Sequence, residues 1–178
     1  MKWDGKLIKE NLEAIQKNLK SHVKIIAVTK KQKLEKIKEC IQNNIFDFGE
    51  NYLNEALEKM SQIRSPNIRW HFIGNVQSNK VKLMLGQFYM WHSVDRVSIL
   101  EEVNKRNPRG CEKILIQINI ANEKSKSGIL PEELPSILEK AKNLKGFSIK
   151  GLMAMPPLEK TEEEAQFYFS QMRELLEK

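Results

Sequence analysis

The sequence contains few cysteines, few aromatic residues and no long apolar run. Only Cys40 and Cys111 occur among 178 residues, and their spacing is not typical of a metal site, which argues against a disulfide framework and against zinc. The first residues carry charge throughout, and no apolar segment is long enough to cross a bilayer. We therefore expect a cytoplasmic protein without a signal peptide or membrane contact, whose cysteines are core or half-buried residues.

The charge of the chain is positive but evenly spread. Thirty lysine and arginine residues are interspersed with 23 acidic ones, giving a net charge of +7 and an isoelectric point near 9.3. No aromatic-rich basic ribbon, helix-turn-helix pattern or zinc finger accompanies this charge, so we expect no nucleic-acid partner. A modest positive field suits an anionic small molecule equally well.

The stretch Val23–Lys30 organises the predicted fold. It is a nearly continuous apolar run of mainly β-branched residues that ends on a lysine. Such a run predicts a strand buried on both faces, as parallel strands between helices are. Further apolar runs predict five more strands, at residues 45–49, 68–74, 88–94, 113–120 and 147–155, with helical patterns between them.

Strict alternation of strands and helices predicts an α/β protein with a parallel sheet, in one domain over residues 1–178. Two arrangements fit, an open doubly wound sheet and a (β/α) barrel. The Gly-x-Gly-x-x-Gly fingerprint is absent, and the turn after the first strand has no glycine, which weakens the dinucleotide-binding alternative. A barrel has eight strands, so on this interpretation about six of eight βα units are present.

Polar residues at the expected helix starts predict how the helices are capped. Asp4 is a candidate cap for the opening helix and Asp95 for the helix after the fourth strand. Thr161 and Glu164 form a capping-box pattern before the last helix, and Pro131 suits the first turn of the preceding one.

Lys30 stands where the first strand ends, and function gathers at the carboxyl ends of strands in both arrangements. A structural interpretation is that this lysine simply marks where the strand leaves the core. In the functional interpretation, desolvation and the neighbouring Lys31 lower the pKa of the amine, which then attacks a carbonyl group. A Schiff base with an aldehyde cofactor is the natural use of such an amine.

Three other residues near the expected strand ends have two interpretations each. Asn51 suits either a helix N-cap or a ligand contact. His71, between two aromatic residues, is more typical of a hydrogen-bonded core histidine than of a catalytic base. Met153 is more typical of the core than of a binding site. The three histidines show no metal spacing, and no Ser-His-Asp or Cys-His arrangement is evident.

Six stretches, in order and spacing, together resemble the pyridoxal phosphate homeostasis proteins. They cover essentially the whole chain, and the run from His71 to Lys80 is the most specific. The stretches are Ala27-Val-Thr-Lys30, Phe48-Gly-Glu-Asn-Tyr52, Trp70-His-Phe-Ile-Gly74 with Gln77-Ser-Asn-Lys80, His92-Ser-Val-Asp95, Glu123-Lys-Ser-Lys-Ser-Gly128 and Gly151-Leu-Met-Ala-Met155.

The resemblance implies a TIM-type barrel similar to the N-terminal domain of alanine racemase, which binds pyridoxal 5′-phosphate through a Schiff base. Lys30 matches the cofactor lysine, Asn51 the asparagine near the pyridine hydroxyl, and Met153 lies on a strand that lines the ring. The resemblance further implies a monomer that carries, buffers or delivers the cofactor, to pyridoxal phosphate-dependent apoenzymes among others, without established catalysis.

The sequence departs from this family in two ways. Thr29 replaces the serine usual before the lysine. The family's phosphate-binding Ser-Met-Gly-Met-Ser and its Arg-Ile-Gly segment occur nowhere in the sequence, in agreement with the count of six units. Two alternatives therefore stay open: a small racemase-type enzyme, although alanine racemases take a second acid/base tyrosine from an additional domain, and an incomplete barrel with weak or no cofactor binding. Open sheet edges could also promote self-association.

Overall fold

The computed structural model describes residues 5–108, 110–157 and 161–177, which fall into two compact units. Unit 1 extends to His71 and unit 2 begins at Phe72. Asp4, the predicted cap of the first helix, lies outside the described residues. No helix within the described ranges combines the length and apolarity that crossing a membrane requires.

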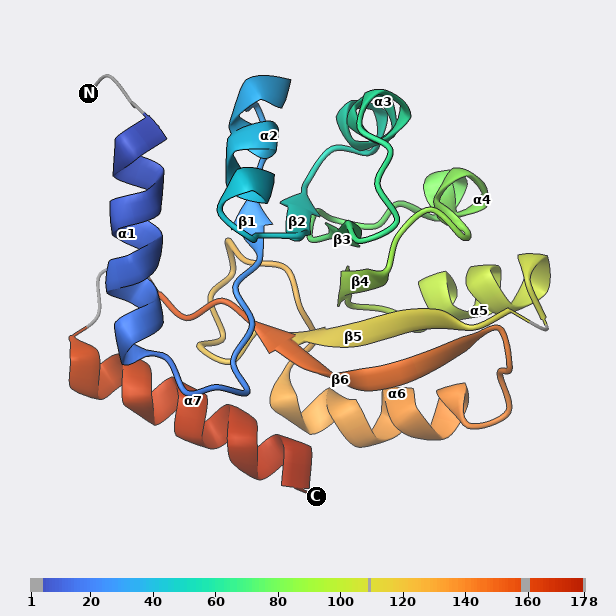
Figure 1. Ribbon diagram of the computed structural model, residues 1–178. Helices are drawn as coiled ribbons and strands as arrows, with labels where there is room; N and C mark the ends of the chain where they lie inside the picture. The colour runs from blue at the N-terminus through green and yellow to red at the C-terminus, as the bar shows by residue number, and fades with distance from the viewer. Residues whose placement is uncertain (1–4, 109, 158–160, 178) are drawn as a thin grey trace. The chain divides into compact units, whose positions relative to one another are not determined.

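Unit 1 contains three helices that alternate with three strands (Figure 1). The strands are hydrogen-bonded in chain order, and the first two pair in parallel. The alternation predicted from the sequence is confirmed here. The elements are α1 Gly5–Asn18, β1 Ala27–Val28, α2 Leu34–Gln42, β2 Asp47–Glu50, α3 Leu53–Gln62 and β3 Arg69–Phe72.

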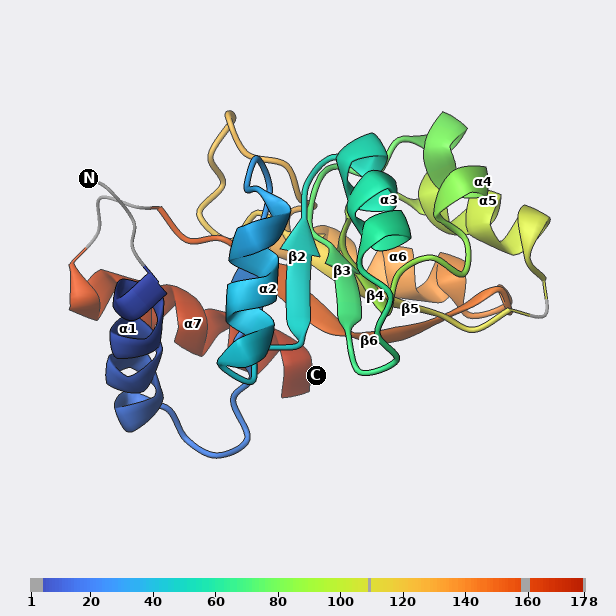
Figure 2. The same ribbon diagram turned by 45° about the horizontal axis from the view of Figure 1, so that its top comes forward.

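The core of unit 1 lies between the helices and the strands. Ile37 of α2, Phe48 of β2 and Ala56 of α3 are completely buried. Phe48 also contacts Trp70 of β3, with 5.5 Å between the ring centroids. The helix α3 packs against β2, so its position depends on this core (Figure 2).

The first strand is shorter and more exposed than the sequence predicts. β1 covers only two residues, and Val23 and Val28 are 44% and 50% exposed, so the prediction of a buried strand over Val23–Lys30 is wrong. The reason is position in the sheet. Among the described residues of unit 1, β1 pairs only with β2, and an edge strand has no second neighbour to cover it.

Unit 2 continues the alternation, with β4, β5 and β6 paired in parallel. β5 and β6 lie side by side over seven paired positions (Figure 1). Most residues of β5 are buried, whereas no residue of β6 is, as expected for a strand with one neighbour. The elements are η1 Ser78–Lys80, α4 Val81–Met84, β4 Met90–Val94, α5 Val97–Arg106, β5 Glu112–Ile118, η2 Pro131–Glu133, α6 Leu134–Ala141, β6 Phe147–Ala154 and α7 Glu162–Glu177.

The predicted caps of unit 2 have mixed outcomes. The capping box before α7 is confirmed, since Thr161 N–H donates to Glu164 Oε2 at 3.0 Å and Glu164 N–H to Thr161 Oγ1 at 3.3 Å. Asp95 does not cap α5, because Arg96 holds that position and pairs with the Asp95 carboxylate. Pro131 begins the short helix η2 instead of α6 itself.

The two cysteines differ in exposure. Cys40 is half-buried on α2, as predicted, and burial raises the pKa of its thiol. Cys111 is exposed, so its prediction as a core or half-buried residue is wrong. It lies in the turn directly before β5, where the chain has not yet entered the sheet.

A buried polar cluster stabilises the amino-terminal ends of β2 and β3. Asp47 Oδ1 accepts hydrogen bonds from Arg69 Nε at 2.6 Å and from His71 Nε2 at 2.9 Å. The Arg69 hydrogen bond, helped by His71 and opposed by burial, lowers the pKa of Asp47. Burial lowers the pKa of His71 despite the opposing effect of Asp47. His71 is thus the hydrogen-bonded core histidine that the sequence favours.

We predict that mild acid destabilises the protein through His71. Because its folded-state pKa is lowered, the folded protein binds fewer protons than the unfolded chain, and stability is lost as the pH falls from the unfolded value of 6.5 through the lower folded value. Urea denaturation should give a smaller free energy of unfolding at about pH 5.5 than at about pH 7.5. The difference in the free energy of unfolding between the two pH values should be smaller in His71→Gln. An equally large difference in that variant would contradict the role given to His71.

Candidate functional site

Lys30 follows the end of β1, and its side chain is exposed. The last pair in register between β1 and β2 is Val28 with Gly49. Beyond this pair, the Thr29 N–H donates to the Gly49 carbonyl oxygen at 3.0 Å, and Lys30 then enters a turn that the Gln32 N–H closes on the Thr29 carbonyl oxygen at 3.0 Å. Asn51 directly follows the end of the neighbouring strand β2. The desolvation predicted for the Lys30 amine is not present within unit 1, where the lysine marks the point at which the strand leaves the core.

Asn51 has a buried side-chain oxygen with an unmet hydrogen bond. Among the described residues, no donor reaches Asn51 Oδ1. The helix α3 begins at Leu53 with Tyr52 at its N-cap and without a side-chain cap, so the interpretation of Asn51 as the cap is wrong. An unsatisfied buried acceptor costs about 1–3 kcal/mol, and a hydroxyl group on a bound molecule would relieve that cost.

A second group of polar side chains, which we call the Lys59 cluster, lies in the same unit as Lys30 and Asn51. It consists of Thr29, Glu50, Glu55 and Lys59, which connect β1, β2 and α3. Thr29, Glu50 and Lys59 are 3%, 0% and 6% exposed. Thr29 and Glu50 are therefore buried side chains, whereas the neighbouring Lys30 is exposed.

The ammonium group of Lys59 uses all three of its N–H donors. Nζ donates to the Thr29 carbonyl oxygen at 2.6 Å, to Glu50 Oε1 at 2.7 Å and to Glu55 Oε1 at 2.6 Å. Glu50 Oε1 also accepts the Thr29 hydroxyl at 2.6 Å. A buried charge is tolerated when it is paired and hydrogen-bonded in this way.

The Lys59 cluster also holds the residue after Lys30. Glu55 Oε1 accepts the main-chain N–H of Lys31 at 2.5 Å, and Lys31 has a φ of 59°, in the left-handed region. Burial would raise the pKa of Glu55, but the hydrogen bonds from Lys59 and Lys31 outweigh it and lower that pKa. The carboxylate is therefore ionised where it holds the turn.

The sequence interpretation did not identify this cluster. Its only local signal is the spacing of Glu55 and Lys59, four residues apart on one helix, which is typical of exposed ion pairs. That Lys59 is buried depends on the packing of α3 against the strands, which no local pattern shows.

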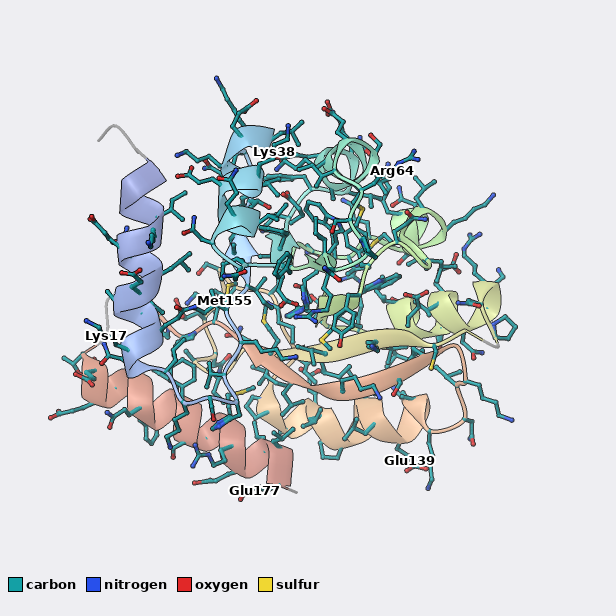
Figure 3. All side chains as sticks on the ribbon, in the orientation of Figure 1. Lys17, Lys38, Arg64, Glu139, Met155 and Glu177 are labelled. Atoms are coloured by element: carbon teal, nitrogen blue, oxygen red, sulfur yellow. The ribbon has the colours of Figure 1, made fainter. Side chains whose placement is uncertain are left out.

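Met153 lies in unit 2, on β6, where it pairs with Gln117 of β5. It is half-buried, whereas Met155 at the end of the strand is 56% exposed (Figure 3). Of the three predicted cofactor residues, Lys30 and Asn51 lie in unit 1, where they follow the ends of the neighbouring strands β1 and β2.

The predicted loop Glu123–Gly128 follows β5 and is held by its own hydrogen bonds. Asn119 Nδ2 donates to the Glu123 carbonyl at 2.9 Å, and the Lys126 ammonium pairs with the Glu123 carboxylate at 2.9 Å. Gly128 has a φ of +122°, and a Cβ there would lie 2.6 Å from Asn119 N, so only glycine fits. Over the described ranges, no group of three or more His, Cys, Asp or Glu side chains could hold a metal ion.

Comparisons of sequence identify related proteins. The family described as alanine racemase, N-terminal domain, matches residues 4–178. The pyridoxal phosphate homeostasis protein of Pseudomonas aeruginosa is 39% identical over 158 residues, which cover 86% of this chain and 68% of that protein. Its counterpart from Pasteurella multocida is 38% identical over 187 residues, covering 96% and 79%. Both are named as homeostasis proteins and not as enzymes.

Comparisons of structure agree. PipY of Synechococcus elongatus without pyridoxal phosphate (PLP) superposes with a TM-score of 0.87 at 30% identity, covering 94% of this chain and 80% of PipY. The PLP-bound form of PipY gives 0.85 at 30% identity, covering 95% and 80%. Alanine racemase of E. faecalis, at 16% identity, shares the fold alone, with a TM-score of 0.77 and coverage of 98% and 50%. The predicted fold class, a barrel of the alanine racemase N-terminal type, is confirmed.

We predict that the Lys59 cluster is a major determinant of stability. Lys59→Met leaves the Glu50 carboxylate buried without its cation, which should cost about 3–5 kcal/mol in the free energy of unfolding. Adding Glu50→Gln removes that charge and should recover about 1–3 kcal/mol. Lys38→Met, on the exposed side of α2 (Figure 3), serves as control and should change stability by less than about 0.5 kcal/mol. Equal losses in the single and double variants would contradict the pairing.

Proposed function

This chain belongs to the alanine racemase N-terminal domain family and, within it, to the pyridoxal phosphate homeostasis proteins, and from this we propose that it binds pyridoxal 5′-phosphate and takes part in its homeostasis. The two forms of PipY, with and without PLP, support the choice of cofactor. We propose a carrier or buffer without catalysis of its own, acting in the cytoplasm and supplying apoenzymes that depend on the cofactor.

The unsatisfied oxygen of Asn51 is the observation that carries this proposal. Pyridoxal phosphate has a ring hydroxyl next to its aldehyde, so its binding group and its reactive group are neighbours. Asn51 Oδ1 is a buried acceptor for which the described residues offer no donor, and Lys30 presents an amine just beyond the end of the neighbouring strand β1. One residue can therefore bind the hydroxyl while the other faces the aldehyde.

The cofactor supplies an aldehyde carbon that accepts an amine. The amine of Lys30 would hold the cofactor through this carbon, with the carbonyl oxygen released as water. Asn51 orients the ring through its hydroxyl. Met153 of β6 stays a proposed contact of the ring, as the family resemblance implies.

We predict that pyridoxal phosphate added to the purified chain produces the long-wavelength absorption band of a Schiff base. Borohydride reduction should then attach the cofactor to Lys30, as peptide mass spectrometry can show. Lys30→Ala should abolish the band, and Lys33→Ala, which removes a nearby lysine, should keep it. An unchanged band in Lys30→Ala would exclude Lys30 as the attachment site.

The chain with pyridoxal phosphate bound can also be assayed for catalysis. We expect no racemisation of D- or L-amino acids, because the relatives are named as homeostasis proteins. Turnover that disappears in Lys30→Ala would instead identify a racemase-type enzyme.

We predict that Asn51→Ala separates binding from stability. The substitution removes an unpaired acceptor, so the free energy of unfolding without cofactor should not fall by more than about 0.5 kcal/mol. Affinity for pyridoxal phosphate should weaken about five- to thirtyfold through loss of the hydroxyl contact. Unchanged affinity, measured by fluorescence titration, would remove Asn51 from the site.

A further inference from the structure

The Lys59 cluster is bonded to the main chain on both sides of Lys30. On the amino-terminal side, Lys59 Nζ holds the Thr29 carbonyl oxygen at 2.6 Å. This oxygen belongs to the peptide group that joins Thr29 to Lys30. On the carboxyl-terminal side, Glu55 Oε1 holds the Lys31 N–H at 2.5 Å, and this N–H belongs to the peptide group between Lys30 and Lys31.

Fixing these two peptide groups fixes the direction of the Lys30 side chain. Each peptide group is planar, so the only soft main-chain rotations at Lys30 are the φ and ψ angles between the two planes. Glu55 and Lys59 lie one turn apart on α3 and bond to each other at 2.6 Å. One face of one helix, together with the turn bond from the Gln32 N–H to the Thr29 carbonyl oxygen, therefore restrains both planes and with them the direction of the Lys30 Cα–Cβ bond.

The conformation of Lys31 is a second sign that this turn is held in place. Its φ of 59° lies in a region that residues with a side chain rarely adopt. Such a conformation persists where the surroundings impose it, and it concentrates at functional sites. Two hydrogen bonds hold this conformation here: the Gln32 N–H donates to the Thr29 carbonyl oxygen at 3.0 Å and closes the turn, and the Lys31 N–H donates to Glu55.

We propose that Lys59 is a positioning residue, which acts with Glu55 to set the orientation of the Lys30 amine for attack on the aldehyde carbon. This inference rests on the proposed function. Lys59 contacts neither the amine nor Asn51. It lowers the number of orientations that the Lys30 side chain samples, and so affects how fast the C=N bond forms more than how tightly the ring and its phosphate bind.

Two ligands distinguish the rate of C=N bond formation from the affinity of binding. Pyridoxal phosphate reports the rate of Schiff-base formation at Lys30, followed by absorbance and confirmed by borohydride reduction and mass spectrometry. Pyridoxine 5′-phosphate, which has an alcohol in place of the aldehyde, reports binding without the covalent step. Both are measured on the whole chain.

The informative variants keep the fold while releasing the turn. Lys59→Met combined with Glu50→Gln removes the buried ion pair as a unit, and Glu55→Ala releases the Lys31 N–H while leaving Lys59 paired with Glu50. Glu58→Ala, on the same helix outside the cluster, is the matched control. We expect both test variants to form the Lys30 adduct at least about tenfold more slowly, with pyridoxine phosphate affinity and the control variant unchanged.

Wild-type rates in both test variants would overturn the inference. So would an equal loss of affinity for both ligands, because that would mean that the cluster supports the site only as a whole. If the unsubstituted chain forms no adduct at Lys30, the proposed function fails and this inference with it. An adduct in the unsubstituted chain together with unslowed variants refutes this inference alone.

Discussion

The burial of one ammonium group is the constraint on which the rest of unit 1 depends. A lysine charge removed from water needs an acceptor for each of its three N–H groups. Lys59 finds them on β1, on β2 and on its own helix, at the Thr29 carbonyl, Glu50 and Glu55. Because these acceptors come from three separate elements, satisfying one charge joins the elements at the carboxyl ends of the strands.

The Lys59 cluster and the pair formed by Lys30 and Asn51 are two groups of polar side chains with different environments. The cluster contains ions and hydrogen bonds that have partners in the protein, apart from Glu50 Oε2, for which the described residues offer none. The pair provides an exposed amine and a buried acceptor for which those residues offer no donor. This division falls within three consecutive residues at a turn: Thr29 is buried in the cluster, Lys30 is exposed, and the Lys31 N–H bonds to Glu55.

The sequence predicted the alternation of strands and helices and the fold class, because apolar periodicity is a local feature. It did not predict that β1 is short and exposed. Val23 and Val28 belong to an apolar run that looks the same in a central and in an edge strand, and only pairing decides which one it is. Lys59 could not be identified either, since its burial depends on how α3 packs against the strands.

A crystal structure of the chain with pyridoxal phosphate tests the central claim most directly. The account predicts continuous electron density from Lys30 Nζ to the former aldehyde carbon, the ring hydroxyl within hydrogen-bonding distance of the Asn51 side chain, and Lys59 still bonded to Thr29, Glu50 and Glu55. Density that joins the cofactor to another lysine, or an Asn51 side chain that faces a protein donor instead of the ring, would contradict it.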